Sequence, residues 1–310
     1  METKIIKGDA VQNRIFTEVK IETAVLREKY GRAPGIAFIG FDCVPLAKYN
    51  IPMHLQAAQS MGFRVMSEIL PNDAQEPEVF AVIDRYNADP GTDAIVLFQP
   101  LPEHLVPVRI VNRISPEKEV EGFHPQNMMA TMIPDIESAR YPMCLPQALV
   151  EMFTDAGTRP APGSEWVYVL DAGFIANTLT RMIVRAAASR VVGPDCPVTF
   201  ISKDAEDLPG HIRRADVLVI VTKSPEYIQP DWLKPGVIII DIYSNLLREV
   251  PSKADPAKMV PVIRGGMNVA AADGIASAIL PIPGGLMTVV MGILFRNTVQ
   301  AFRLAMNKPG

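Results

Sequence analysis

His54 is the side chain of this sequence best suited to move a proton near neutral pH, and it stands on a predicted helix. The pKa of histidine is about 6.5, so the ring can gain or release a proton under physiological conditions. A single histidine in such a position is more often an ordinary surface or core residue, and that alternative stays open. The sequence therefore makes His54 a candidate acid or base rather than an assigned one.

Two carboxylates lie in turns where small ligands commonly bind. Glu121 belongs to the loop Lys118-Glu-Val-Glu-Gly122, where a solvated surface acid is the simplest interpretation. Asp171 follows a predicted buried strand, and a dinucleotide site needs glycines at such a turn because the backbone must approach pyrophosphate. Asp171 instead brings negative charge, and repulsion between two charges at about 4 Å costs on the order of 1–4 kcal/mol.

Neither the cysteines nor the histidines are spaced as metal ligands. Cys43, Cys144 and Cys196 are odd in number and far apart, and no Cys-x-x-Cys pair occurs. The four histidines are equally scattered. We therefore expect reduced, buried cysteines and no metal site.

Length and composition are those of a globular protein of about two domains. The 310 residues are 48% hydrophobic and 21% charged, which excludes intrinsic disorder. A net charge of −4 without long basic runs argues against nucleic-acid binding. The N-terminus is charged at once, and prolines and glycines interrupt the most apolar stretch, 275–294. We therefore expect a cytoplasmic protein that binds neither nucleic acid nor membrane.

Alternating periodicity predicts two α/β units that would position these side chains. In the first half the pattern predicts helices over 9–29, 52–61 and 76–88, and strands over 35–41, 63–70 and 94–98. After a boundary rich in proline and glycine at 158–164, it predicts strands over 166–170, 198–201, 217–221 and 237–241, with helices over 174–189 and 208–214. A long amphipathic helix over 284–305 ends the chain. This order is typical of parallel sheets covered by helices.

Short motifs in a shared order run along nearly the whole chain. They are Ile5-Ile-Lys-Gly8, Pro34-Gly-Ile-Ala37, Pro100-Leu-Pro-Glu-His104, Lys118-Glu-Val-Glu-Gly-Phe-His-Pro125, Trp232-Leu-Lys-Pro-Gly236, Pro281-Ile-Pro-Gly-Gly285 and Asn297-Thr298. By these motifs the chain resembles the methylenetetrahydrofolate dehydrogenase/cyclohydrolases. The resemblance implies a folate-binding domain over 1–157, with 284–310 packing back on it, and a Rossmann-like domain over 158–283.

The resemblance also implies a folate pocket in which Glu121 replaces an aspartate that contacts the pterin ring. A carboxylate suits that contact because the pterin amino group and ring N–H present paired donors to its two oxygens. The extra methylene of Glu121 moves the carboxylate by roughly 1.5 Å. The other folate contacts that the resemblance implies are Asn50, Phe98, Gln99, Pro100, Leu101, Pro283, Gly284, Gly285 and Thr288.

The lysine that drives cyclohydrolase chemistry in the family, in a Tyr-x-x-x-Lys motif, has no counterpart here. One register places Asn50 and His54 at the two positions, and a shift of one residue places Tyr49 and Met53 there. Neither register restores the lysine. We therefore predict that cyclohydrolase activity of the family kind is weak or absent.

A glutamine that supports this lysine in the family is also replaced. Phe98 stands at its position, unless Gln99 substitutes for it one residue later. His54, as a proton shuttle, and Glu121, which orients the pterin, remain the candidate catalytic residues.

The nucleotide site that the resemblance implies departs from the family at several positions. The Asp-Ala-Gly turn lacks two of the family's glycines, a further glycine is a lysine, and a Tyr-Ser pair adds bulk. The residues of this degenerate site are Asp171, Ala172, Gly173, Lys223, Tyr243 and Ser244. We therefore expect that NAD(P) binding is lost.

With folate retained and nicotinamide lost, we predict a non-redox use of 5,10-methylenetetrahydrofolate. The methylene carbon would pass to a nucleophilic second substrate, which the sequence does not identify, in a Mannich-type condensation or cyclisation. One alternative is a divergent NAD(P)-dependent dehydrogenase with weak or no cyclohydrolase activity. Another is an inactive folate-binding homologue. The resemblance further implies a homodimer paired through the second domain.

Overall fold

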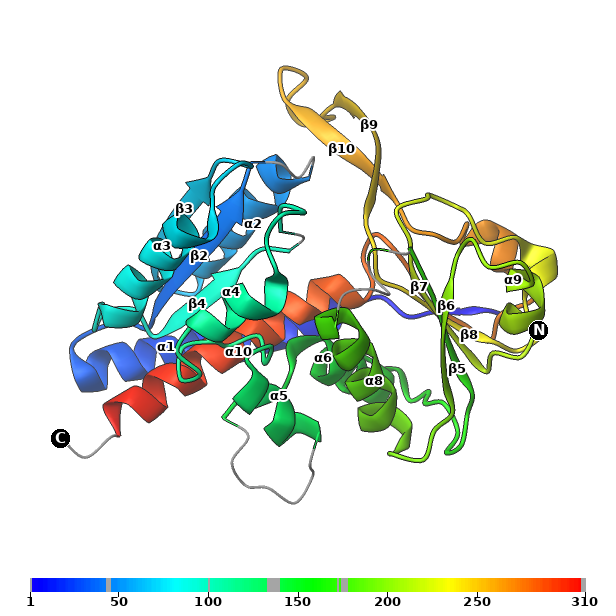
Figure 1. Cartoon of the computed structure of the whole chain (residues 1–310), viewed down its shortest axis with the longest axis horizontal. Helices are drawn as coiled ribbons and strands as arrows, with labels where there is room; N and C mark the ends of the chain where they lie inside the picture. The colour runs from blue at the N-terminus through cyan, green and yellow to red at the C-terminus, as the bar shows by residue number, and fades with distance from the viewer. Residues whose placement is uncertain are drawn as a thin grey trace. The chain divides into compact units, whose positions relative to one another are not determined.

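The computed structural model describes residues 2–42, 46–99, 101–132, 140–171, 173 and 178–307. The chain divides into two compact units, which are coloured by residue number in Figure 1. The six-stranded unit comprises Met1–Val11 and Leu145–Val290, and the three-stranded unit comprises Gln12–Cys144 and Met291–Gly310. The division falls inside two long helices, α1 (Asp9–Tyr30) and α10 (Leu286–Met306). Both units are α/β, as the sequence predicted.

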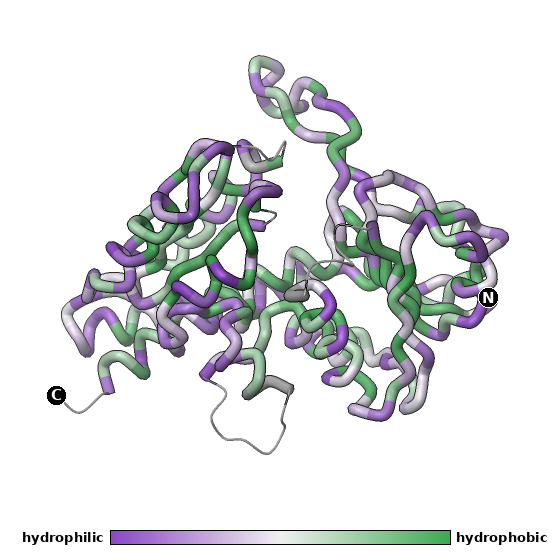
Figure 2. Tube along the Cα trace, in the orientation of Figure 1, coloured by the Kyte–Doolittle hydropathy of each residue, from purple (hydrophilic) through white to green (hydrophobic). Residues whose placement is uncertain are grey.

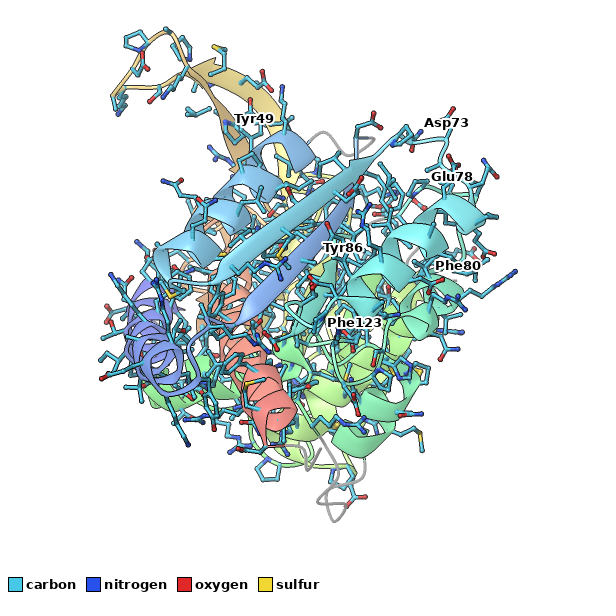
Figure 3. The ribbon with its side chains drawn as sticks, turned by 90° about the vertical axis from the view of Figure 1, so that its left-hand side faces the viewer. Tyr49, Asp73, Glu78, Phe80, Tyr86 and Phe123 are labelled. Atoms are coloured by element: carbon cyan, nitrogen blue, oxygen red, sulfur yellow. The ribbon has the colours of Figure 1, made fainter. Side chains whose placement is uncertain are left out.

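The three-stranded unit is built on a parallel sheet with the strand order β3-β2-β4. Its elements are β2 (Gly35–Phe41), α2 (Ala47–Ser60), β3 (Arg64–Leu70), α3 (Glu76–Ala88), β4 (Ala94–Leu97), α4 (Pro107–Arg113) and α5 (Pro125–Met132). In Figure 3, Tyr49 marks α2, and Phe80 and Tyr86 mark α3. The central strand β2 is buried at every residue, as expected for a strand with a neighbour on each side.

The C-terminal part of α10 packs on this unit. The ring of Phe295 lies 5.5 Å from the ring of Phe16 and 5.6 Å from that of Phe63, measured between centroids. Asn297 donates hydrogen bonds to the carbonyls of Val120 (2.8 Å) and Pro142 (2.9 Å). The prediction that the last helix returns to the N-terminal domain is therefore confirmed.

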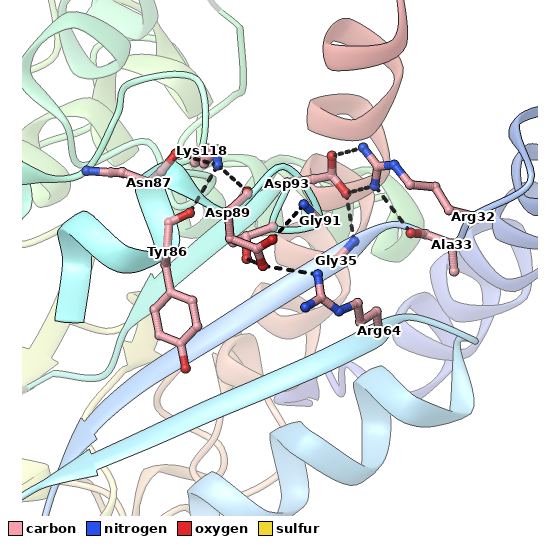
Figure 4. Close-up of polar contacts among 11 residues, drawn as sticks. Arg32, Ala33, Gly35, Arg64, Tyr86, Asn87, Asp89, Gly91, Asp93 and Lys118 are labelled. Atoms are coloured by element: carbon pink, nitrogen blue, oxygen red, sulfur yellow. Dashed lines mark hydrogen bonds and ion pairs between the residues drawn. The ribbon is translucent and has the colours of Figure 1, made fainter.

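A polar network holds the amino end of this sheet together (Figure 4). The guanidinium of Arg32 donates to both oxygens of Asp93, at 2.7 and 2.9 Å. One of these oxygens also accepts the backbone N–H of Gly35 at 2.8 Å. Because Asp93 precedes β4 and Gly35 begins β2, this carboxylate joins the starts of two neighbouring strands.

The six-stranded unit contains a parallel sheet with the strand order β1-β11-β8-β7-β5-β6. Its elements are β1 (Lys4–Ile5), α6 (Cys144–Ala156), β5 (Trp166–Leu170), α8 (Thr178–Val192), β6 (Val198–Ser202), α9 (Leu208–Ile212), β7 (Val217–Val221), η1 (Pro230–Trp232), β8 (Ile238–Asp241), η2 (Ala270–Ala272) and β11 (Ala278–Leu280). The strands β5, β7 and β8 are buried at every residue, and Figure 2 shows them as hydrophobic segments. Such continuous apolar runs are typical of strands buried on both faces.

The first residues of the chain belong to the six-stranded unit, because β1 pairs with β11. The sequence instead predicted one domain over 1–157. A strand of two residues is too short for a periodic pattern to reveal, and its partner lies near the other end of the chain.

Helix α2 begins at Ala47 rather than at Pro52, so Pro52 lies inside it. The sequence placed Pro52 in the first turn, where a missing N–H costs no hydrogen bond. Because proline has no backbone N–H, Pro52 makes no hydrogen bond to the carbonyl four residues earlier. Its restricted φ is helical, so the helix continues through it.

A further element that the sequence did not reveal is an antiparallel hairpin of β9 (Asn245–Pro251) and β10 (Met259–Arg264). In Figure 1 the hairpin extends away from the six-stranded sheet of its unit. It exposes Leu247, Met259 and Val260, which are 51%, 46% and 38% exposed.

Two absences hold for the part of the chain that the structure describes. None of its helices combines the length and the apolar character of a bilayer-spanning segment. Nor do three or more histidine, cysteine, aspartate or glutamate side chains gather there as metal ligands.

Candidate active site

The loop 118–124 is tied to the three-stranded unit by its first residue. The ammonium group of Lys118 donates to the carbonyls of Tyr86 (3.0 Å), Asn87 (2.8 Å) and Asp89 (2.9 Å), as Figure 4 shows. A helix leaves its last carbonyls without partners inside the helix, and a cation satisfies them. Lys118 therefore anchors the loop to the end of α3.

Glu119 organises the same loop from inside. It is only 2% exposed, and its carboxylate accepts the backbone N–H groups of Glu121 (2.9 Å) and His124 (2.8 Å). The amide of Asn127 donates to the Glu119 carbonyl at 3.0 Å and lies 3.4 Å from the carboxylate. The sequence did not identify Glu119, and its only signal was its position two residues before Glu121.

Glu121 lies beside β4. A parallel bridge joins Ile95 to Glu119, and a backbone hydrogen bond from Leu97 reaches the Glu121 carboxyl. Burial raises the pKa of Glu121 to about 8, the charge of Glu119 adds to the rise, and the Leu97 bond opposes it. The residue is still partly exposed to solvent, so a ligand can reach it. At neutral pH the free protein therefore holds a proton on Glu121.

Gly122 allows the loop to turn directly after Glu121. Its φ is +85°, a conformation that side chains disfavour. A Cβ atom there would lie 2.7 Å from the Cα of Met143. The turn thus requires glycine, and the N–H of Cys144 donates to the Glu121 carbonyl at 3.1 Å on the same side.

His54 lies on α2 with one ring nitrogen already engaged. Its Nδ1 is 2.7 Å from the carbonyl oxygen of Asn50. A carbonyl only accepts, so Nδ1 carries the hydrogen and Nε2 is the nitrogen that can exchange a proton. Burial lowers the pKa of His54, against a smaller opposing effect of the Asn50 bond, so the ring is neutral at pH 7.

Phe98 connects the two candidate catalytic residues. Its ring centroid lies 5.0 Å from that of His54, edge to face, and 5.6 Å from that of Phe38, stacked. Phe98 directly follows Leu97, whose backbone binds the Glu121 carboxyl. The structure therefore places His54 and Glu121 at the carboxyl edge of one parallel sheet.

The remaining predicted folate contacts divide between the two units. In the three-stranded unit Leu101 is buried and Gln99 is exposed, while Pro100 lies outside the described residues. Pro283, Gly284, Gly285 and Thr288 lie in the six-stranded unit, at the start of α10. The Gly284 carbonyl accepts the N–H of Gly8 at 2.9 Å, and a Cβ on Gly285 would lie 2.3 Å from the Pro281 oxygen. Close packing accounts for Gly285, and a φ of +87° accounts for Gly284.

The charge of Asp171, at the carboxyl end of β5, is compensated in the six-stranded unit. Its carboxylate accepts the backbone N–H of Lys223 and lies 3.9 Å from the ammonium nitrogen of Lys203. Lys203 directly follows β6 and also pairs with Asp204 at 2.6 Å. The sequence predicted repulsion of phosphate by Asp171, but it did not identify Lys203, which is distant in sequence and supplies the opposite charge.

Of the other residues of the predicted degenerate site, Tyr243 is close enough to Asp171 to sense its charge. Tyr243 and Ser244 follow β8 and are half-buried. Burial and the Asp171 charge raise the pKa of Tyr243. Gly173 is exposed, and a Cβ atom there would meet nothing within 4 Å. Ala172 is not among the described residues.

Comparison with known families decides the relationship that these features suggest. Residues 6–121 match the catalytic domain of tetrahydrofolate dehydrogenase/cyclohydrolase, and residues 143–306 match its NAD(P)-binding domain. The chain belongs to this family. It is therefore a folate-dependent enzyme of one-carbon metabolism, as the motifs implied.

Individual relatives are similar to this chain over nearly their whole length. The bifunctional protein FolD of Desulfosudis oleivorans is 32% identical over 303 residues, which span 98% of each chain. The FolD of Methylorubrum extorquens is 30% identical over 312 residues, covering 100% of this chain and 95% of the relative. The N5,N10-methylenetetrahydrofolate dehydrogenase-cyclohydrolase of Trypanosoma brucei, solved with NADP and an inhibitor, has a TM-score of 0.83 and 27% identity, covering 99% and 100% of the two chains.

The expectation that NAD(P) would be excluded is wrong. Residues 143–306 form the NAD(P)-binding domain of the family. The expectation treated Asp171 as a bare negative charge, whereas Lys203 and the Lys223 N–H both face its carboxylate. Compensation of this kind removes much of the Coulomb repulsion, which was one of several grounds for the expectation.

Proposed function

We propose that the chain is an NAD(P)-dependent 5,10-methylenetetrahydrofolate dehydrogenase with weak or no cyclohydrolase activity. The observation that carries this proposal is the NAD(P)-binding domain over 143–306, in one chain with the catalytic domain over 6–121. A bound nicotinamide supplies the hydride acceptor. The prediction of a non-redox transfer depended on exclusion of the nicotinamide, so NAD(P) takes the place of the unidentified second substrate.

Glu121 is the residue that we assign to the pterin. Its two oxygens accept the ring N–H and the amino group when the carboxyl is ionised. Because its pKa is raised to about 8, binding of the pterin at neutral pH draws a proton off Glu121. Phe98, which is half-buried, provides apolar surface at the same sheet edge.

Weak cyclohydrolase activity follows from the residue on α2 that faces Phe98. His54 contacts the rings of Phe38 and Phe98, whereas the neighbouring Met53 is 49% exposed. These contacts favour the register in which His54, rather than Met53, stands at the lysine position. A neutral imidazole with a lowered pKa supplies a base but no permanent positive charge.

The six-stranded unit fits a dinucleotide at the carboxyl edge of its sheet. In a dinucleotide-binding unit the ribose lies near the end of the second strand, where a cation accommodates a 2′-phosphate. Lys203 follows β6 directly and offers such a cation. Lys203 lies 3.9 Å from Asp171 and 2.6 Å from Asp204, so it balances part of the charge of Asp171.

The proposal is tested by adding 5,10-methylenetetrahydrofolate together with NAD or NADP. Formation of the reduced nicotinamide is measured by its absorbance. We expect turnover with NADP, and we expect Lys203→Gln to weaken NADP binding by about 1.5–3 kcal/mol while changing NAD binding less. Calorimetric titration of each nucleotide measures this difference. Folate binding without turnover on either nucleotide would support the inactive homologue instead.

We also propose that the chain forms a homodimer through the six-stranded unit. The supporting feature is the hairpin of β9 and β10, whose exposed Leu247, Met259 and Val260 lie on a small two-stranded element. Met259 and Val260 are consecutive in β10 and so lie on opposite faces of the hairpin, and several exposed apolar side chains on one element are typical of interfaces. We expect the double variant Leu247→Glu/Val260→Glu to be monomeric by light scattering and the wild type dimeric; a monomeric wild type would contradict the proposal.

A further inference from the structure

The loop that carries Glu121 is held by an acidic side chain rather than by packing alone. Glu119 is buried, and its two oxygens accept different backbone groups, the N–H of Glu121 and the N–H of His124. These groups lie before and after the turn at Gly122. One carboxylate therefore determines the path of the backbone on both sides of the turn.

We propose that Glu119 is a positioning residue for folate recognition: by binding these two N–H groups, its carboxylate sets the direction in which the Glu121 carboxyl meets the pterin. The proposal rests on the proposed function, because it requires that Glu121 contact the pterin. Glu119 itself is 2% exposed, so it acts through Glu121 rather than on the ligand.

The two carboxyls also interact through their charge. Burial raises the pKa of Glu119, and hydrogen bonds from the backbone of His124, Glu121 and Phe123 and from the Asn127 amide oppose that rise, whereas Glu121 receives a single backbone bond from Leu97. The proton of the pair therefore resides on Glu121. The other titratable group that couples to both is the buried thiol of Cys144, whose pKa burial raises well above its usual value, so it is neutral.

The remaining charges near the loop come from the elements packed against it. Burial lowers the pKa of His124, and the charge of Arg140 adds to this lowering. Tyr141 donates its hydroxyl to the Glu117 carbonyl, and burial raises the pKa of this hydroxyl above its usual value. The ammonium group of Lys118 is engaged by the carbonyls at the end of α3. Among these described groups, Glu119 is the charge that raises the pKa of Glu121.

The experiment measures the dissociation constant of tetrahydrofolate from pH 6 to pH 9 by calorimetry. For the wild type we expect affinity to rise with pH through a midpoint near 8, because the ionised Glu121 accepts the pterin donors. In Glu119→Gln the like charge is removed, so we expect the midpoint to fall by about one pH unit. The amide NH₂ also faces a backbone donor, so affinity should fall at least 10-fold at every pH.

A second variant separates the effect of the charge of Glu119 from the effect of the length of its side chain. Glu119→Asp keeps the charge and draws the carboxylate back by roughly 1.5 Å. We expect weaker binding with the midpoint near that of the wild type. A role confined to folding would lower the melting temperature in both variants without moving the midpoint in either.

Glu206→Gln serves as the control, because Glu206 is an exposed acid of the six-stranded unit, and it should match the wild type in both quantities. Wild-type affinity and midpoint in Glu119→Gln would overturn the proposal. A wild-type affinity that is flat from pH 6 to pH 9 would overturn it without any variant. Absence of tetrahydrofolate binding by the wild type would instead overturn the proposed function.

Discussion

Replacing Glu121 with alanine is expected to weaken the binding of tetrahydrofolate by about 1–3 kcal/mol. The cost arises because the pterin amino group and ring N–H lose their acceptors and are left unpaired in a partly buried site. Since the same contact holds the pterin in the transition state, kcat/KM of the dehydrogenase should fall by a comparable factor. Calorimetry at pH 9, where the wild-type Glu121 is ionised, gives the largest difference.

The control for this substitution is Glu206→Ala, which removes an exposed acid from the other unit. It should leave both the affinity and the turnover at wild-type values. An unchanged folate affinity in Glu121→Ala would remove Glu121 from the pocket, and the pterin contact would then have to come from another residue of the carboxyl edge.

The substitution His54→Gln is expected to abolish the weak hydrolysis of 5,10-methenyltetrahydrofolate that the wild type retains and to leave the dehydrogenase reaction within a few-fold. Glutamine keeps a polar group of similar reach but cannot exchange a proton. Hydride transfer to the nicotinamide requires no proton shuttle, so the two reactions should respond differently. Chromatographic separation of the methenyl and formyl products measures both in one assay.

The pH dependence of the hydrolysis provides a second check on His54. A base works in its neutral form, and burial lowers the pKa of His54 below its usual 6.5. The rate should therefore be constant above pH 6.5 and decline only at lower pH, where the ring gains a proton. Met53→Gln is the matched control, because Met53 is the exposed neighbour on α2. Loss of hydrolysis in that variant but not in His54→Gln would favour the other register.

Much of the fold was predictable because long buried strands carry a strong signal. The runs at β2, β5 and β7 are apolar at nearly every residue, and the structure has strands at the predicted positions. The short strand β1 and the hairpin of β9 and β10 escaped prediction for different reasons. β1 has only two residues, and the hairpin has an exposed surface without clear alternation.

Part of the candidate site was also predictable, because some of its residues lie in recognisable motifs. Glu121 and His54 could be proposed because motifs mark their positions along the chain. Lys118 and Glu119 lie in the same motif but act through contacts with backbone groups, which a residue's type does not reveal. Lys203 lies outside every motif, and only the neighbouring ends of β5 and β6 bring it to Asp171.

The sequence by itself determined the family, the two α/β units and the absence of a lysine at the position of the family's Tyr-x-x-x-Lys motif. Tertiary structure alone decided the charge states. From the sequence, Asp171 was expected to repel phosphate, but in the structure Lys203 lies 3.9 Å from its carboxylate. From the sequence, Glu121 was an ordinary acid, but in the structure burial and the charge of Glu119 raise its pKa to about 8. The physical reason is that an electrostatic energy depends on distance and on the surrounding medium, and both are properties of the folded chain rather than of residue order.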